Sequence, residues 1–217
     1  MLKVIVFDFD YTLGDSSKGI ALSINHALEK LGYTAKNMDE IKRTIGLSLK
    51  ETYFLLSGSE NLKEAELFVK FFKEKADDVM VENTVFYPGV LETLLKLREN
   101  GYKIAIVTTK FHYRIEQILR KYNACGLIDL IVGAEDVKVE KPNPEGLLWV
   151  IDYFRVEKKD VHYVGDSIVD AKTAENAKVK FAAVLTGTTS RADHENYCNV
   201  YIGMNVTDVF TNVLSLE

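Results

Sequence analysis

The chain has 217 residues, of which 47% are hydrophobic and 27% charged, values that are ordinary for a globular protein. This length allows one well-buried core, or a core domain with a smaller insertion. The formal net charge of −5 and the lack of a basic block argue against nucleic acid as a main partner. A local cationic pocket could still bind a phosphorylated small molecule.

Two features of the sequence bear on where the protein works. Cys125 and Cys198 show no CxxC spacing and no nearby histidine cluster, so we expect two buried thiols in a reducing cytosol, and neither a disulfide nor a zinc site. The apolar run at the start of the sequence is too short for a signal peptide, and no apolar stretch approaches the length of a membrane span. The sequence therefore predicts a cytoplasmic protein, monomeric or homodimeric, without a membrane partner.

Five short apolar runs predict the strands of the core. They are rich in β-branched residues and nearly continuous, which is typical of strands buried on both faces of a parallel sheet. The runs are 4–7, 104–107, 127–132, 161–164 and 181–185. Helical spacing of apolar residues marks 90–99, 113–122 and 144–154. Because strands and helices alternate, we predict an α/β core with a doubly wound parallel sheet and right-handed crossovers.

The stretch between the first two predicted strands has a different pattern. No convincing strand is found from Ser16 to about Asn83, whereas apolar residues recur at helical spacing there. These residues predict an insertion of three or four helices, residues 16–83, within a core made of residues 1–15 and 84–217. Pro88 fits a stiff turn where the chain re-enters the core.

Polar residues follow the predicted strands, and in an open parallel sheet ligands bind at the carboxyl ends of the strands. The candidates are Asp8, Asp10, Thr108, Lys141, Asp166 and Asp170. Clustered carboxylates suit Mg²⁺, a hard ion that prefers oxygen ligands and that can neutralise a bound phosphate. A carboxylate can attack phosphorus to form an aspartyl phosphate, while a hydroxyl and an ammonium hold the equatorial oxygens. If these strand ends converge, the sequence predicts a site for phosphoryl transfer.

The same residues resemble the four motifs of the haloacid dehalogenase superfamily, in the same order along the chain. The DxDxT motif stands at 8–12, the second-strand Thr is Thr108, the Lys-Pro motif is Lys141-Pro142, and GDxxxD stands at 165–170. Each motif alone is weak, but the ordered set, each member after a predicted strand, is specific. The resemblance implies a Rossmann-like core with a small helical cap inserted after the first strand, and a phosphatase that uses Mg²⁺.

The resemblance also implies a role for each motif residue. Asp8 would be the nucleophile and a metal ligand. Asp10 would act as general acid and base and would bind the metal through its backbone carbonyl. Thr108 and Lys141 would bind the phosphoryl group of a small phosphorylated metabolite. Two further acids would complete the metal site, Asp166 as a direct ligand and Asp170 by holding a metal-bound water or by orienting the lysine.

Residues beside the motifs are expected to contact the substrate. Phe9, Tyr11 and Thr109 lie in the same strand-end loops. Tyr11 departs from the family pattern, in which Gly usually follows the second aspartate because it permits unusual backbone angles and close ligand approach. We expect the tyrosine to narrow the pocket or to contact the leaving group.

The predicted cap carries candidates for substrate selection. Residues 43–48 resemble the specificity loop of the phosphoglycolate phosphatase branch of the superfamily. Arg43 is a candidate anchor for a substrate carboxylate, since a guanidinium binds carboxylates bidentately. An ordinary surface arginine is an equally good interpretation. Thr44 and Lys110 are further, weaker candidates.

Other functions remain open at this point. An inorganic pyrophosphatase of the same branch shares the second motif, and no residue separates the two activities. A β-phosphoglucomutase-like phosphotransferase would carry a Ser-Arg pair in the cap loop, which here reads Gly-Leu-Ser-Leu-Lys at 46–50. A non-catalytic module that binds phosphate and Mg²⁺, such as a receiver domain, would be shorter and would place an acid where Thr108 stands. A haloacid dehalogenase proper uses one aspartate and no metal, which Asp10 and Asp166 argue against.

Overall fold

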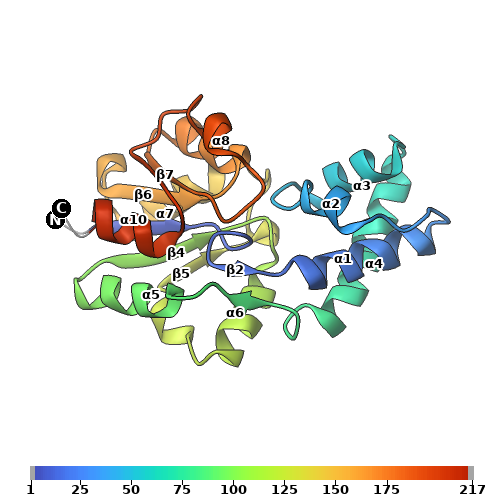
Figure 1. The fold of residues 1–217 in the computed structure, drawn as a ribbon, viewed down its shortest axis with the longest axis horizontal. Helices are drawn as coiled ribbons and strands as arrows, with labels where there is room; N and C mark the ends of the chain where they lie inside the picture. Colours follow the sequence, from blue (N-terminus) through green and yellow to red (C-terminus); the bar gives the residue numbers. More distant parts are fainter. Residues whose placement is uncertain (1–2, 215–217) are drawn as a thin grey trace. The chain divides into compact units, whose positions relative to one another are not determined.

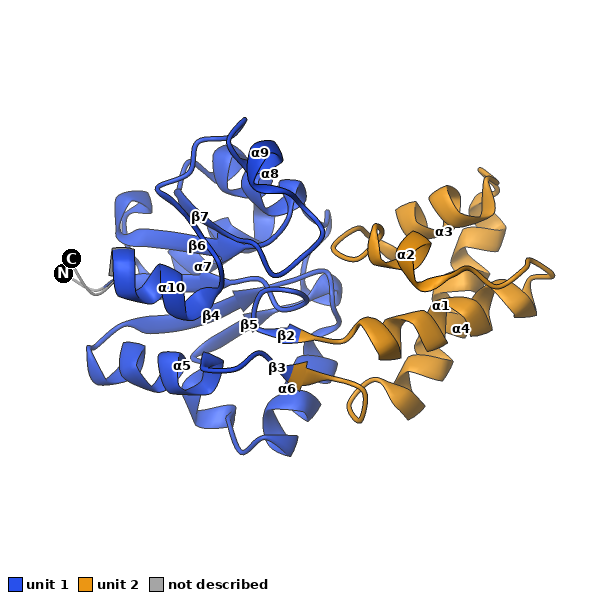
Figure 2. Cartoon of the chain, viewed as in Figure 1, with its two compact units in different colours: residues 1–14, 86–217 blue, residues 15–85 orange. Residues whose placement is uncertain are grey.

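The computed structural model describes residues 3–214, so the outermost residues of the predicted core, 1, 2 and 215–217, lie outside the described part. The chain forms two compact units, residues 1–14 with 86–217 and residues 15–85 (Figure 2). The predicted division placed the boundaries after Asp15 and Asn83, and as a division into domains it remains a prediction.

Within the described residues, the larger unit is built on a six-stranded sheet with the order β5-β4-β1-β6-β7-β8 (Figure 1). Neighbouring strands are parallel throughout the sheet. Because the chain adds strands first on one side of β1 and then on the other, the switch point lies at the carboxyl end of β1. The strands are β1 (Val4–Phe7), β4 (Lys103–Val107), β5 (Leu130–Val132), β6 (Val161–Gly165), β7 (Lys180–Val184) and β8 (Tyr201–Gly203).

Strand β1 is buried on both faces. Val4 and Val6 pack with helices α7 and α8, whereas Ile5 and Phe7 point to the opposite face and are equally inaccessible to solvent. Helices α5 and α10 contact each other on that opposite face (Figure 1). The helices of this unit are α5 (Val90–Glu99), α6 (His112–Lys121), α7 (Glu145–Phe154), α8 (Ile168–Ala177), α9 (Arg191–His194) and α10 (Val206–Val209).

The predicted fold class, an α/β core with a doubly wound parallel sheet, is confirmed. The third predicted strand is shorter than expected, because Cys125–Leu127 forms a 3₁₀ turn and β5 begins only at Leu130. The edge strand β8 was not predicted, since three residues carry too little periodicity. The remaining short turns are η2 (Ala134–Asp136), η3 (Lys158–Asp160) and the π-helical η4 (Phe210–Leu214).

Residues 15–85, all of them described, form a helical unit with its own core. Four helices make up this unit, α1 (Ser17–Lys30), α2 (Met38–Lys42), α3 (Leu49–Ser57) and α4 (Leu62–Val79). Its core combines Ile24, Tyr53 and Phe68 with other apolar side chains of these helices. Two residues each from β2 (Gly14–Asp15) and β3 (Val85–Phe86) form a separate two-stranded sheet where the chain passes from one unit to the other.

Two expectations about the surface have different outcomes. Both cysteines are exposed, so the expectation of buried thiols was wrong: Cys125 lies in the 3₁₀ turn and Cys198 in an irregular segment after α9, and neither belongs to a core-facing strand or helix. Among residues 3–214, none of the helices combines the length and the apolar character needed to cross a bilayer.

Candidate active site

The loop after β1 folds tightly around one backbone carbonyl. The C=O of Phe9 accepts hydrogen bonds from the N–H groups of Thr12, Leu13 and Gly14, at 3.2, 2.9 and 3.1 Å. Tyr11 has a φ of 61°, in the left-handed region that favours glycine. This conformation accounts for the glycine expected at this position in the family. Here a tyrosine adopts it, with its side chain almost fully buried.

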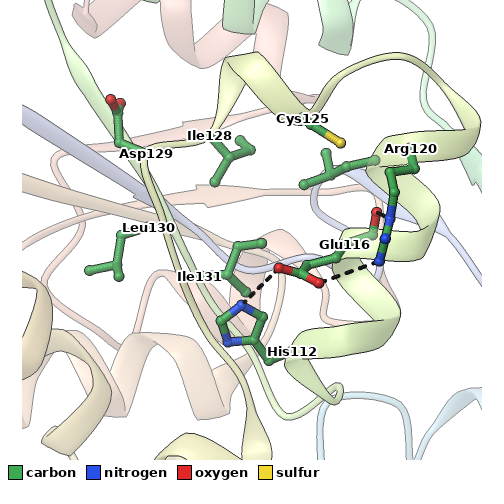
Figure 3. Close-up of a pocket in the computed structure, with 9 residues that line it drawn as sticks. His112, Glu116, Arg120, Cys125, Ile128, Asp129, Leu130 and Ile131 are labelled. Atoms are coloured by element: carbon green, nitrogen blue, oxygen red, sulfur yellow. Dashed lines mark hydrogen bonds and ion pairs between the residues drawn. The ribbon is translucent and has the colours of Figure 1, made fainter.

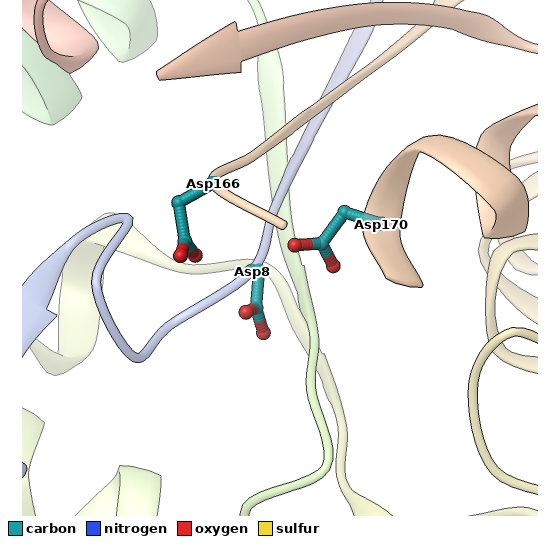
Figure 4. Close-up of side chains that lie close together, drawn as sticks. All are labelled: Asp8, Asp166 and Asp170. Carbon is teal, nitrogen blue, oxygen red and sulfur yellow. The ribbon is translucent and has the colours of Figure 1, made fainter. Parts of the chain in front are cut away.

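Three carboxylates come together at the carboxyl ends of β1 and β6 (Figure 4). Asp8, Asp166 and Asp170 are all buried, and an oxygen of each lies within 4.8 Å of the others. The sheet brings the first two together, because Phe7 pairs with Val164 and each acid follows closely after its strand. Asp170 joins them from the first turn of α8.

Lys141 provides the positive charge of this cluster. Its Nζ lies 2.7 Å from Asp170 Oδ1 and 3.0 Å from Asp8 Oδ1, and it donates a hydrogen bond to the hydroxyl of Tyr163 at 3.1 Å. Although burial alone would lower the pKa of Lys141, the charges of Asp170 and Asp8 raise it. The lysine therefore stays protonated while almost completely buried.

The three acids respond differently to this environment. Burial raises the pKa of Asp8 to about 7, against the opposing effect of Lys141. Burial, together with the charges of Asp170 and Asp8, also raises the pKa of Asp166 well above its usual value. Burial would do the same to Asp170, but Lys141, Ser167 and Tyr163 lower its pKa. One lysine is therefore not enough to keep all three acids ionised, and a further cation would favour the charged forms of Asp8 and Asp166.

The free oxygens of the cluster fit a hard divalent cation. Asp8 Oδ1 is buried and accepts no hydrogen bond from residues 3–214, its contact with Lys141 being an ion pair. The hydroxyl of Thr12 donates a hydrogen bond to Asp166 Oδ1 at 3.1 Å. Oxygen donors of this kind are the ligands that Mg²⁺ prefers. Asp8 and Asp166 therefore fit the metal that the sequence predicts.

Asp170 is already fully engaged by protein groups. Its Oδ1 accepts from Lys141 and from the Tyr163 hydroxyl, each at 2.7 Å, and its Oδ2 accepts from the backbone N–H and the hydroxyl of Ser167 at 3.1 and 2.6 Å. A carboxylate offers about four acceptor positions, and here four donors occupy them. Of the two roles considered for Asp170, this geometry favours orienting Lys141.

Asp10 is not one of the three clustered acids, and it forms an ion pair with a different lysine, Lys110. Its Oδ2 lies 2.9 Å from Nζ of Lys110, and both side chains are largely buried. Lys110 follows Thr108 at the end of β4, and its N–H donates to the Thr108 hydroxyl at 3.2 Å. A second buried ammonium therefore lies beside the predicted general acid and base.

The remaining predicted site residues are placed as follows. The ring of Phe9 is fully buried and meets Phe86 edge to face, with 5.8 Å between ring centroids, while Thr109 is partly exposed at the end of β4. Arg43 and Thr44 belong to the helical unit, where Arg43 is exposed at the end of α2 and the Thr44 hydroxyl donates to the C=O of Ile41 at 2.8 Å. Their contact with a substrate remains a prediction.

Several residues of the site were missed by the sequence analysis. The Tyr163 hydroxyl contacts both Lys141 and Asp170, although the apolar run that contains Tyr163 predicts only core packing. Buried His194 donates through Nε2 to the backbone C=O of Asp166 at 3.1 Å, and burial lowers its pKa. Gly187 approaches Asp166 so closely that a Cβ added there would lie 1.9 Å from Oδ2. No sequence pattern marks these last two contacts.

A second cavity in the larger unit is lined by a different set of side chains. A cavity of about 410 Å³ lies between α6 and β5 (Figure 3). Glu116 on its wall is paired with His112 at 3.7 Å and with Arg120 at 3.4 Å, and apolar side chains such as Ile131 line the rest. Asp129, which also lines the cavity, forms ion pairs with Arg98 at 3.0 Å and with Lys103 at 2.9 Å.

Comparison with known proteins agrees with this geometry. A family model described as haloacid dehalogenase-like hydrolase matches residues 5–184. The chain belongs to this family. It is similar to a phosphoglycolate phosphatase of Aquifex aeolicus, with 32% identity over 86% of either chain. It is also similar to the pyrophosphatase PpaX of Bacillus mycoides, with 28% identity over 96% of this chain and 95% of the relative.

A solved structure shares the architecture of this haloacid dehalogenase-like hydrolase. A Bacteroides fragilis protein described as belonging to the same family is 40% identical, with a TM-score of 0.92 over 95% of this chain and 98% of the other. The predicted family and the predicted enzymatic nature of the chain are thereby confirmed.

Gly187 gives a direct test of how tightly the site is built. In Gly187→Ala the new methyl group would collide with the Asp166 carboxylate and displace it. If Asp166 binds the predicted metal, we expect phosphatase activity to fall by about 10- to 100-fold, the usual effect of disturbing the support of a metal ligand. Gly126→Ala is the matched control, because a Cβ there meets no atom within 4 Å. Wild-type activity in the Gly187 variant would show that activity does not depend on this position of the Asp166 carboxylate.

Proposed function

We propose that this haloacid dehalogenase-like phosphatase depends on Mg²⁺ and hydrolyses a small phosphomonoester through an aspartyl phosphate on Asp8. The observation that carries the proposal is the buried cluster in which the carboxylate of Asp8 lies beside Lys141 and Asp166. An anionic nucleophile, a fixed cation and free oxygen ligands for a metal are the parts that phosphoryl transfer requires.

The metal would be held by Asp8, Asp166 and the backbone carbonyl of Asp10. When bound, it would neutralise the charge that otherwise separates an anionic phosphate from an anionic nucleophile. Thr12 and His194 support this part of the site, since the Thr12 hydroxyl donates to the Asp166 carboxylate and the imidazole donates to the backbone C=O of the same residue.

Asp8 and Asp10 divide the chemistry between them. An oxygen of Asp8 attacks phosphorus, and the bond from phosphorus to the leaving-group oxygen breaks as Asp10 gives that oxygen a proton. Asp10 then accepts a proton from a water molecule, which attacks phosphorus and releases inorganic phosphate and free Asp8. The contact of Lys110 Nζ with Asp10 Oδ2, at 2.9 Å, supports a fixed position for Asp10 and leaves Oδ1 to carry the proton.

Lys141 and Thr108 would bind the equatorial oxygens of the phosphoryl group, where negative charge resides in the transition state. Two successive contacts support this role of Lys141. Its Nζ lies 2.7 Å from the Asp170 carboxylate, and that carboxylate accepts hydrogen bonds from the backbone N–H and the hydroxyl of Ser167. This chain of contacts fixes the ammonium beside the nucleophile before any substrate arrives, which reduces the reorganisation that catalysis needs.

For the substrate we propose phosphoglycolate or a similar carboxylated phosphoester. Support comes from the Aquifex aeolicus relative named phosphoglycolate phosphatase and from Arg43, which is exposed in the helical unit. Inorganic pyrophosphate is the second candidate, because the Bacillus mycoides relative named pyrophosphatase PpaX matches 96% of this chain. Both candidates are small and carry a second anionic group.

Phosphate release tests the proposed reaction. With Mg²⁺ we expect release from phosphoglycolate to exceed release from pyrophosphate, sugar phosphates and an aryl phosphate, and we expect EDTA to abolish it. Asp8→Asn should reduce turnover by roughly three orders of magnitude or more, because the nucleophile is lost. Asp152→Asn, at an exposed position on α7, serves as the control with wild-type turnover. Undiminished turnover in the Asp8 variant, or in EDTA, would contradict the proposal.

Arg43 can be tested separately from the chemistry. If its guanidinium binds the substrate carboxylate, Arg43→Ala should raise the KM for phosphoglycolate about tenfold, the effect of losing one charged hydrogen bond, and should leave the KM for a neutral aryl phosphate nearly unchanged. Lys50→Ala, which removes another exposed cation of the helical unit, should change neither value. Equal effects of the Arg43 substitution on both substrates would remove this residue from the substrate site.

A further inference from the structure

Tyr163 places a neutral hydroxyl among the charged groups of the site. The residue lies in β6 and is completely buried. Its hydroxyl oxygen lies 3.1 Å from Lys141 Nζ, 2.7 Å from Asp170 Oδ1 and 3.2 Å from the backbone C=O of Val107. It therefore touches the two charged side chains that flank the nucleophile, as well as the backbone just before Thr108.

The direction of each hydrogen bond follows from the donors that are present. A phenol has one proton, and the shorter contact to a charged acceptor takes it, so the hydroxyl donates to Asp170. An ammonium can only donate, so Lys141 donates to the phenol oxygen. Tyr163 is thus an acceptor for the lysine and a donor to the acid at the same time.

Acceptors surround the ammonium of Lys141 in this arrangement. It donates hydrogen bonds to Asp170 at 2.7 Å and to Tyr163 at 3.1 Å, and its third N–H group is left for the ion pair with Asp8 at 3.0 Å. To bind a phosphoryl oxygen and keep both carboxylate partners, the lysine must release the phenol. Two of these acceptors are carboxylates, and the phenol is both the neutral one and the most distant.

We propose that Tyr163 is a positioning residue that occupies one N–H of Lys141 in the free enzyme and yields it to the phosphoryl oxygen when substrate binds. This inference rests on the proposed phosphatase function. An anionic phosphoryl oxygen is a stronger acceptor than a neutral phenol, so the exchange favours binding. The hydrogen bond from Tyr163 to Asp170 can persist in both states, which keeps Asp170 in place while the lysine changes its partner.

The proposal predicts an unusual effect of removing the hydroxyl. Tyr163→Phe deletes a contact that the free enzyme has and the phosphate-bound enzyme lacks, while the ring can keep its packing against Phe181, with centroids 6.0 Å apart. Only the free state then loses the hydrogen bond to Lys141. Inorganic phosphate should therefore bind about three- to tenfold more tightly, the range that one net hydrogen bond provides.

The experiment measures the dissociation constant of inorganic phosphate, in the presence of Mg²⁺, for the full-length wild type and the variant. Melting curves establish that both are folded, and the KM of an aryl phosphate should fall in parallel with no rise in kcat. Tyr53→Phe is the matched control. It removes another fully buried tyrosine hydroxyl that donates to a carboxylate, that of Glu64 in the helical unit, so it should lower the melting temperature without tightening phosphate binding.

The outcomes separate this inference from the proposed function. Unchanged or weaker phosphate binding in a folded Tyr163→Phe variant would overturn the role of Tyr163, because a hydroxyl that merely supports the fold gives no gain in affinity. In that case the phosphatase proposal stands if the wild type still releases phosphate. A wild-type protein that neither hydrolyses phosphoesters nor binds phosphate would overturn both.

Discussion

Three buried carboxylates share one small space with a single buried ammonium, and the rest of the site is arranged around that imbalance. Removing like charges from water is unfavourable unless a counter-charge is near, and here burial raises the pKa values of Asp8 and Asp166. Lys141 compensates for part of this charge. In the proposed reaction, a bound cation would compensate for the rest and would in turn favour the binding of a phosphate. The same feature that makes the site expensive to fold makes it chemically useful.

The fold keeps these charges together by leaving their backbone little freedom. Strand β1 is buried on both faces and hydrogen-bonded between β4 and β6, so the position of Asp8 is determined by the centre of the sheet. The contacts around the acids come from distant parts of the chain: Gly187 lies against Asp166, and Ser167 holds Asp170 at the start of α8. Rigid support of this kind is what a preorganised electrostatic site requires.

The sequence predicts the parts of the site that depend on strand ends. An apolar run followed by an acid predicted both the burial of β1 and the exit of Asp8 at its carboxyl end, because parallel strands deliver their ends to one edge. The sequence could not show that Tyr163 contacts Lys141, since a tyrosine inside a buried strand is expected only to pack against its apolar neighbours. The sequence did not mark Gly187 either, because this residue matters only by having no side chain where Asp166 approaches it. Lys110 was considered as a substrate contact, whereas the structure pairs it with Asp10.

The central claim is that the phosphoryl group passes through Asp8, and the stereochemical course at phosphorus tests it most directly. A phosphate ester made chiral with oxygen isotopes would be hydrolysed in isotopically labelled water, and the configuration of the released phosphate determined. Two successive in-line displacements, first by Asp8 and then by water, predict net retention. Net inversion would mean that water attacks the substrate directly, and it would contradict the covalent role assigned to Asp8.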